Sequence, residues 1–286
     1  MLPREVRVPP ESVASEHGDN SYHYEAWRYL VGTVRDLPEI SLVFDPKLGM
    51  GCWSAYDLLV DGARVALDIS DYVLVDGAVG GYDHWLRFSY TPLFAPFPKI
   101  GSFPITSFLD WNEYERLSSE VDYRAQGETI VYGQRDHAAE GLPGGKTQRR
   151  QRVRELLAAS YGAKLDDAWT ELEPFWRRAA AALVTVCVPG TSNHHLDRGQ
   201  HQLLGLGVCT ISPDIFMAPL GDRLVPGEHY VACRDDYVDL ADCIEWCREN
   251  RAACRTIGRE AKQFFRTHST PRAIWTYVGE RVQSSG

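Results

Sequence analysis

The segment from Val184 to Phe216 constrains this chain more than any other stretch, because it contains four elements in order. A β-branched run at residues 183–188 ends in Pro-Gly, and a polar loop with two histidines follows. The residues from Asp197 to Gly207 then have helical spacing, and a second apolar run at residues 208–211 ends in Ser-Pro. Gly207 stands where a helix carries its C-cap glycine. The pattern predicts strand, loop, helix and strand, which is the repeating unit of a parallel α/β sheet.

The loop of this unit is the first candidate for a binding site. In a parallel α/β sheet, the loop after a strand and the N-terminus of the next helix face the ligand crevice. Backbone N–H groups at such a helix end favour anions. We therefore expect a phosphorylated small molecule to bind at the loop that follows the first strand.

Composition limits the class of protein. The chain has 286 residues, of which 44% are apolar and 11% aromatic, so it can build a core in one large domain or two lobes. Its net charge of −9 argues against broad nucleic-acid binding. It contains no apolar run near the roughly 20 residues that span a bilayer. We see no signal-peptide pattern in the first 20 residues, which we expect to form a loose arm.

The cysteines favour a reducing environment. The chain has seven, an odd number, and Cys243, Cys247 and Cys254 fall on one face of a predicted helix. We expect them to be reduced core residues of a cytoplasmic protein, with disulfides or a metal as the alternatives.

The N-terminal half offers carboxylates as candidate bases. We expect a helix at residues 22–34 and strands at 40–44, 56–60 and 64–69, with an Asp-Gly hairpin turn between the last two. Asp68 and Asp71 stand at the end of the last of these strands, where a carboxylate can be a general base or a turn residue. The aromatic stretch at residues 76–98, which contains Asp83, is either an acceptor pocket or a core element with a loop.

The C-terminal half is more regular. We place the boundary between lobes in the charged stretch 109–126 and expect a strand at 129–132. A helix at 147–161 carries four arginines, one or two of which could reach a diphosphate, although a solvated helix face is the alternative reading. We also expect a helix at 169–183, a strand at 227–232, a helix or helix pair at 239–265 and a last helix at 273–282.

A resemblance to a known family rests on the order of several residues in this half. The helix that ends at Gly207 leads to a strand, and the family's further features then follow as Pro226, His229-Tyr230-Val231, Asp235-Asp236, Trp246 and Ile257-Gly258. This succession resembles the C-terminal half of the lipopolysaccharide-modifying and protein O-glucosyltransferase family, the capsule-associated group of GT-B type glycosyltransferases.

The resemblance implies an α/β fold with two Rossmann-like lobes of GT-B type, the N-terminal lobe being reduced. Residues 1–125 would form the acceptor-side lobe, residues 126–270 the lobe that binds the nucleotide-sugar donor, and residues 271–286 a C-terminal helix. The implied activity moves a sugar from that donor to a hydroxyl of a glycan, a protein or a metabolite, without a metal or other cofactor.

The resemblance also places the donor. Its site would fall on Gly133, Arg135, Gly190, Thr191, Ser192, Asn193, Asp197 and Arg198. Related enzymes often carry a ribose-binding Glu five residues before the helix-ending glycine, where this chain has Gln202. For the base that takes the acceptor proton we expect Asp71 or Asp83, with Asp68 as the next choice.

Two alternatives belong to other classes. His194, His195, Asp197 and His201 form the pattern HHxDxxxH, in which the last two lie one helical turn apart and could share the metal of a hydrolase. A catalytically inactive module that binds a nucleotide is the other alternative.

Overall fold

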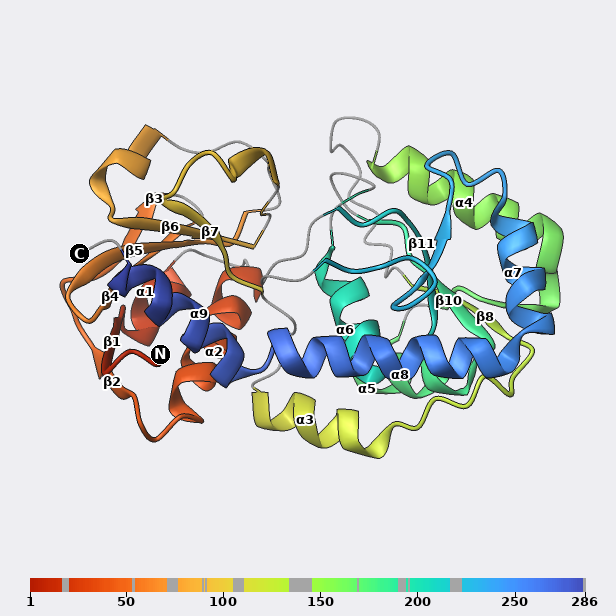
Figure 1. The fold of residues 1–286 in the computed structure, drawn as a ribbon, viewed down its shortest axis with the longest axis horizontal. Helices are drawn as coiled ribbons and strands as arrows, with labels where there is room; N and C mark the ends of the chain where they lie inside the picture. Colours follow the sequence, from red (N-terminus) through yellow and green to blue (C-terminus); the bar gives the residue numbers. More distant parts are fainter. Residues whose placement is uncertain are drawn as a thin grey trace. The chain divides into compact units, whose positions relative to one another are not determined.

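The computed structural model describes residues 1–16, 21–52, 55–70, 77–88, 90, 92–104, 111–133, 146–168, 170–189, 194, 196–216 and 223–284. The chain forms two units: unit 1 comprises residues 1–116, 219–221 and 267–286, and unit 2 comprises residues 117–218 and 222–266. The division falls within helix α3 (Trp111–Glu120). Each unit is built on its own sheet (Figure 1).

Unit 1 contains a mixed sheet with helices packed on it. Its strands are β1 (Glu5–Val8), β2 (Ser41–Phe44), β3 (Met50–Cys52), β4 (Ala55–Val60), β5 (Ala63–Asp68), β6 (His84–Arg87) and β7 (Ile100–Ser102). Its helices are α1 (Glu11–Glu16), α2 (Ser21–Arg35) and α9 (Pro271–Gln283), with the 3₁₀ turns η1 (Gly77–Gly81) and η2 (Pro92–Phe94).

The strands of this sheet lie in the order β2-β1-β4-β5-β6-β7, and β3 pairs with β4. Neighbouring strands are parallel except at β4, which is antiparallel to β1, β3 and β5. The predicted Asp-Gly hairpin joins β4 to β5, and both turn residues have positive φ, 48° at Asp61 and 88° at Gly62. A two-residue turn of this kind matches the twist of the two strands.

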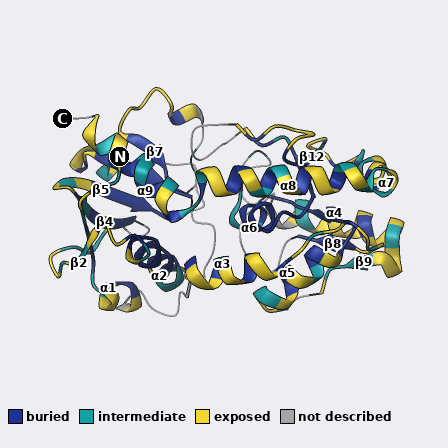
Figure 2. Ribbon diagram, turned by 60° about the horizontal axis from the view of Figure 1, so that its bottom comes forward, coloured by how far each residue is buried: buried dark blue, intermediate teal, exposed yellow. Residues whose placement is uncertain are grey.

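The core of unit 1 lies between the sheet and the helices α2 and α9. Trp27 and Leu30 of α2 share a cluster with Ile274 and Trp275 of α9, and the indole of Trp275 donates to Thr33 Oγ1 at 3.0 Å. Figure 2 shows most of α2 in the colour of buried residues.

The expected loose arm at the N-terminus is wrong. Residues 5–8 form β1, which lies between β2 and β4, and Val6 and Val8 are fully buried. Four residues between polar and proline-rich neighbours give little local signal, because the pairing that stabilises this strand is with residues far away in sequence.

Unit 2 is a Rossmann-like α/β unit, and its strands are all parallel. They are β8 (Ile130–Tyr132), β9 (Leu165–Asp166), β10 (Val184–Val186), β11 (Thr210–Pro213) and β12 (Val231–Cys233). Its helices are α4 (Lys146–Tyr161), α5 (Leu172–Ala181), α6 (Arg198–Leu206), α7 (Leu240–Glu249) and α8 (Arg251–His268), with the 3₁₀ turn η3 (Gly162–Lys164). The predicted α/β class is confirmed by the parallel sheets and helices of the two units.

The predicted strand, loop, helix and strand are also found. They are β10, α6 and β11, with Asp197 as the N-cap of α6 and Gly207 as its left-handed C-cap at φ 79°. The expected helix or helix pair at 239–265 is a pair, which breaks at Asn250 between α7 and α8.

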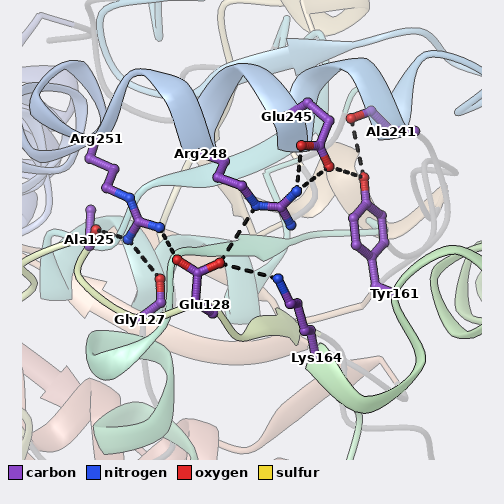
Figure 3. A network of polar contacts seen from close by, with 9 residues as sticks. All are labelled: Ala125, Gly127, Glu128, Tyr161, Lys164, Ala241, Glu245, Arg248 and Arg251. Carbon is purple, nitrogen blue, oxygen red and sulfur yellow. Dashed lines mark hydrogen bonds and ion pairs between the residues drawn. The ribbon is translucent and has the colours of Figure 1, made fainter.

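A polar network ties the amino edge of this sheet together (Figure 3). The guanidinium of Arg251 donates to the carbonyls of Ala125 and Gly127 at 3.0 and 2.9 Å and pairs with Glu128. Glu128 also lies 3.3 Å from Lys164 Nζ and 3.7 Å from Arg248 Nε. The contacts with Arg251 and then with Lys164 lower the pKa of Glu128. The network therefore connects the approach to β8 with the junction of α7 and α8.

Among the described residues, no helix is both long enough and apolar enough to cross a bilayer.

Candidate functional site

The strand order of unit 2 defines one special position at the carboxyl edge of its sheet. The order β9-β8-β10-β11-β12 means that the chain moves outward from β8 to β9 and then back across to β10 on the other side of β8. The strand that follows β8 and the strand that follows β10 therefore lie on opposite sides of this pair. Open α/β sheets bind ligands in the crevice that opens at such a switch point.

The N-terminus of α6 is built by Asp197. Its carboxylate Oδ1 accepts the N–H of Gln200 at 2.9 Å, while its backbone stays extended, with φ −77° and ψ 166°. This cap satisfies one of the N–H groups that lack a partner within the helix. The aligned peptide dipoles add a partial positive charge at this end, which favours an anion.

Two arginines of α4 reach the same place. Arg149 Nη2 donates to the carbonyl of Pro189 at 2.7 Å, and Arg150 Nε donates to the carbonyl of Val188 at 3.1 Å. These carbonyls belong to the second and third residues after β10. The hydroxyl of Tyr132, at the end of β8, donates to the carbonyl of Arg150 at 3.1 Å, which anchors α4 to this edge of the sheet.

Arginine and aspartate side chains meet at this edge of the sheet. Arg150 Nη2 lies 3.4 Å from Asp197 Oδ2, and each of these two side chains is only 14% exposed. The pair neutralises the carboxylate at the helix end. The guanidinium of Arg149 lies at the same end of β10, and burial lowers its pKa from the usual 12.5. Two arginine side chains and a helix N-terminus therefore gather at the switch point.

Gly133 allows the backbones to approach at this point. Its N–H donates to the carbonyl of Val186 at 2.8 Å, and a Cβ atom on it would lie 2.9 Å from that oxygen and 3.0 Å from Cys187 Sγ. A Cβ on Gly199, in the first turn of α6, would lie 3.7 Å from the carbonyl oxygen of Gly133. The structure thus brings together Gly133, Asp197 and the first turn of α6, which contains Arg198.

A second polar group lies where β11 ends. The carboxylate of Asp214 accepts the hydroxyl of Tyr230 at 2.6 Å and pairs with Arg223 at 3.2 Å. The Nδ1 atom of His194 lies 2.8 Å from the carbonyl oxygen of Asp214, and its Nε2 lies 3.4 Å from Asp235 Oδ2. Both neighbours of the imidazole, the carbonyl of Asp214 and the carboxylate of Asp235, are hydrogen-bond acceptors.

Other predicted residues occupy the interior. Gln202, the expected ribose contact, is 4% exposed within α6. His201 is 3% exposed and lies edge-on to Phe265 at 5.1 Å between ring centroids. Burial lowers the pKa of His201 to about 3, so the ring is neutral at physiological pH.

The histidine pattern does not form a metal site among the described residues. There the carboxylate of Asp197 caps α6 and pairs with Arg150, and His201 packs against Phe265. The group of His, Cys, Asp or Glu side chains with metal-site dimensions in that part of the chain consists of Cys209, Cys247 and Cys254.

The two candidate bases that lie in the described part of unit 1 are at opposite edges of its sheet. Asp68 ends β5, is 3% exposed, and pairs with Arg87 Nε at 3.2 Å, while the indole of Trp85 donates to it at 3.2 Å. Asp83 directly precedes β6, and its Oδ2 accepts the N–H of Arg64 at 2.8 Å. Asp68 therefore lies at the carboxyl edge and Asp83 at the amino edge.

Several predicted residues lie outside the described part of the chain. They are Asp71, Arg135, Gly190, Thr191, Ser192, Asn193 and His195.

The sequence did not single out the arginines that reach the switch point. Arg149 and Arg150 were two of four arginines on one predicted helix, and Arg152 and Arg154 gave the same signal. Residues 149 and 150 lie in the first turns of α4, which is the end of a helix that meets the carboxyl edge in a βαβ unit. That position could have distinguished them.

Comparisons with known proteins return short or distant matches. No family model matches the chain. It is 51% identical over 57 residues to a protein of Invertebrate iridescent virus 3 named "Uncharacterized protein 035R", and 38% identical over 55 residues to "Uncharacterized protein 179R" of Invertebrate iridescent virus 6. These segments are 20% and 19% of this chain, and the chain spans 5% of each relative.

Among solved structures, the chain is similar to sucrose-phosphate synthase (tll1590) from Thermosynechococcus elongatus. The two are 15% identical with a TM-score of 0.44, and the match covers 71% of this chain and 58% of that chain.

Proposed function

We propose that the chain is a metal-independent glycosyltransferase that moves a sugar from a nucleotide-sugar donor to a hydroxyl acceptor. The observation that carries this proposal is the switch point of unit 2, where the guanidinium groups of Arg149 and Arg150 meet the N-terminus of α6. The sugar-transfer chemistry is added by the family resemblance of the C-terminal half.

The charges suit a diphosphate. Guanidinium groups bind phosphate oxygens with two parallel hydrogen bonds, and a helix N-terminus offers backbone N–H groups to the same anion. In the reaction, the bond between the anomeric carbon and the diphosphate oxygen breaks, and the leaving diphosphate keeps the electron pair. Fixed positive groups stabilise that developing charge without a metal ion.

The acceptor half of the reaction needs a base. The base takes the proton of the acceptor hydroxyl as its oxygen bonds to the anomeric carbon. Asp68 is poorly suited, because Arg87 and Trp85 already occupy its carboxylate in a buried site. Asp83 binds the backbone of Arg64 at the amino edge of the sheet. We therefore keep Asp71 as the proposed base.

The proposal assigns donor binding to unit 2 and acceptor binding to unit 1. The donor residues would be Arg149, Arg150, Gly133, Asp197 and Arg198, together with the predicted Arg135 and residues 190–193.

Substitution of the arginines tests the donor site. A hydrogen bond to a charged group contributes about 1.5–3 kcal/mol, so Arg149→Ala should weaken the binding of a nucleoside diphosphate by about 10-fold to 100-fold. Arg154→Ala is the matched control on the same helix, since Arg154 pairs with Asp167 at 2.6 Å. Isothermal titration calorimetry measures both variants, and circular dichroism checks their folds.

Arg198→Ala tests a donor contact that the family resemblance alone implies. It should also weaken diphosphate binding while the fold stays intact. Equal affinity of wild type, Arg149→Ala and Arg198→Ala would remove the switch point from the proposal.

A further inference from the structure

Three buried thiols meet at the amino edge of the unit 2 sheet. Cys209 directly precedes β11, Cys247 lies in the last turn of α7, and Cys254 lies in the first turn of α8. All three are fully buried, and their Sγ atoms lie within 4.8 Å of one another. They come from three different elements, so their convergence does not follow from the periodicity of one helix.

The spacing suits one metal ion. Three sulfur atoms at about 2.3 Å from a central ion lie about 4 Å apart, so each thiol would shift by less than about 1 Å to close on it. Among the described residues, no fourth His, Cys, Asp or Glu joins this group. The hydroxyl of neighbouring Tyr123 donates to the carbonyl of Leu183 at 2.5 Å and is committed to the backbone.

The number and type of ligands favour one kind of ion. Thiolates bind soft metal ions. A structural Zn²⁺ ion needs four ligands, and this group offers three sulfur atoms. Cu(I) is the soft ion of biology that three sulfur atoms can satisfy. We propose that Cys209, Cys247 and Cys254 form a three-sulfur site for one Cu(I) ion, which ties the junction of α7 and α8 to the start of β11.

The surroundings can balance the charge of such a site. Binding releases the thiol protons to solvent, because the ligands are thiolates. Cys254 lies at the N-terminus of α8, where the helix dipole favours negative charge. The positively charged side chain of Arg251 stands in the same first turn of α8.

The polar network of Figure 3 holds the site in place. Arg251 is fixed by the carbonyls of Ala125 and Gly127, so the first turn of α8 has a defined position relative to the sheet. The thiols lie at the amino ends of the strands, and the proposed donor site lies at their carboxyl ends. The ion would therefore be structural, and this inference does not rest on the proposed function.

A competition titration tests the site. Reduced, metal-free protein is titrated with Cu(I) under anaerobic conditions against a chromogenic Cu(I) chelator, and X-ray absorption then reports the ligands. We expect one Cu(I) per chain, a first shell of sulfur only, and a higher melting temperature, because the ion binds the folded state.

Variants separate the three thiols from the other cysteines. Cys254→Ser should weaken Cu(I) binding by at least tenfold, with Cys209→Ser as a second variant if the first does not fold. Cys243→Ser is the matched control on α7, because its Sγ contacts the carbonyl of Ala232 instead of the cluster. Loss of all Cu(I) to the chelator by the wild type, or equal affinity of Cys254→Ser, would overturn the proposal. So would a tetrahedral Zn²⁺ site with a nitrogen or oxygen ligand.

Discussion

The contact between α6 and α8 gives a sharp prediction for Gly258. Gly258 of α8 packs against Gly207, the C-cap of α6, and a Cβ atom on Gly258 would lie 2.1 Å from the carbonyl oxygen of Gly207 and 3.1 Å from Tyr123 Cδ1. Alanine in a helix interior is normally favoured over glycine by about 1 kcal/mol. Here the methyl group would meet backbone, which cannot rotate away, so the helices must separate.

We expect Gly258→Ala to destabilise the chain by about 1–2 kcal/mol. Overpacking of a filled contact costs about 1–3 kcal/mol. The higher helix propensity of alanine offsets about 1 kcal/mol of this cost, so the net cost is at most about 2 kcal/mol. Because the clash is with a carbonyl oxygen at 2.1 Å, the upper part of the range applies.

Urea unfolding followed by far-UV circular dichroism measures this free energy. The control is Gly199→Ala in the first turn of α6, where a Cβ atom would meet its nearest neighbours at 3.6 and 3.7 Å, which are ordinary contacts. That variant should be as stable as the wild type or more so. A Gly258→Ala protein with an unchanged or higher unfolding free energy would refute the packing argument.

Three further predictions concern caps and titrating groups. Asp197→Ala removes the N-cap of α6 and should cost about 1 kcal/mol by urea unfolding, whereas Asp197→Asn should cost less; equal costs would show that the cap bond is unimportant. The pKa of His201 is about 3 in the folded chain and 6.5 when exposed, so the unfolded state binds a proton that the folded state does not. Stability should therefore fall by up to about 1.4 kcal/mol per pH unit below about pH 6.5, and thermal unfolding of His201→Leu should show a flatter dependence between pH 6 and 4, while an unchanged slope would contradict it. The pKa of Glu128 is lowered from 4.5, so its contribution is present above that value and is lost as the pH falls through the folded pKa. Glu128→Gln should flatten the acid limb of the stability profile there, and the same limb in both proteins would exclude the ion-pair network as its cause.

The sequence predicted those parts of the fold that depend on residues close together in the chain, such as helix caps and tight turns. The helix of α6 begins at an Asp that caps it and ends at a Gly with positive φ, and both residues are readable in the sequence. The Asp-Gly turn between β4 and β5 is equally local. Strand β1 was missed because four residues acquire their structure from partners at residues 41–44 and 59–60.

The residues of the candidate site also differ in how far the sequence alone could predict them. Gly133 and Asp197 could be predicted, because a glycine after a strand and an N-cap before a helix have characteristic positions. The choice of Arg149 and Arg150 among the arginines of α4 depends on which helix end meets the carboxyl edge, and the strand order decides that. The cysteine cluster needed the tertiary structure for a similar reason. Periodicity grouped Cys243 with its helix neighbours, whereas Cys209 joins Cys247 and Cys254 from the position just before β11.

Nucleotide binding is the direct test of the proposed donor site. The melting temperature of the chain is measured with UDP, GDP, TDP, ADP and CMP, each with and without EDTA. The account predicts that one nucleoside diphosphate raises the melting temperature, because at 100 times its dissociation constant a ligand adds about 2.7 kcal/mol to folding stability. It also predicts that EDTA leaves this shift unchanged. No shift with any nucleotide would contradict the account, and a shift that EDTA abolishes would contradict its metal-independent form.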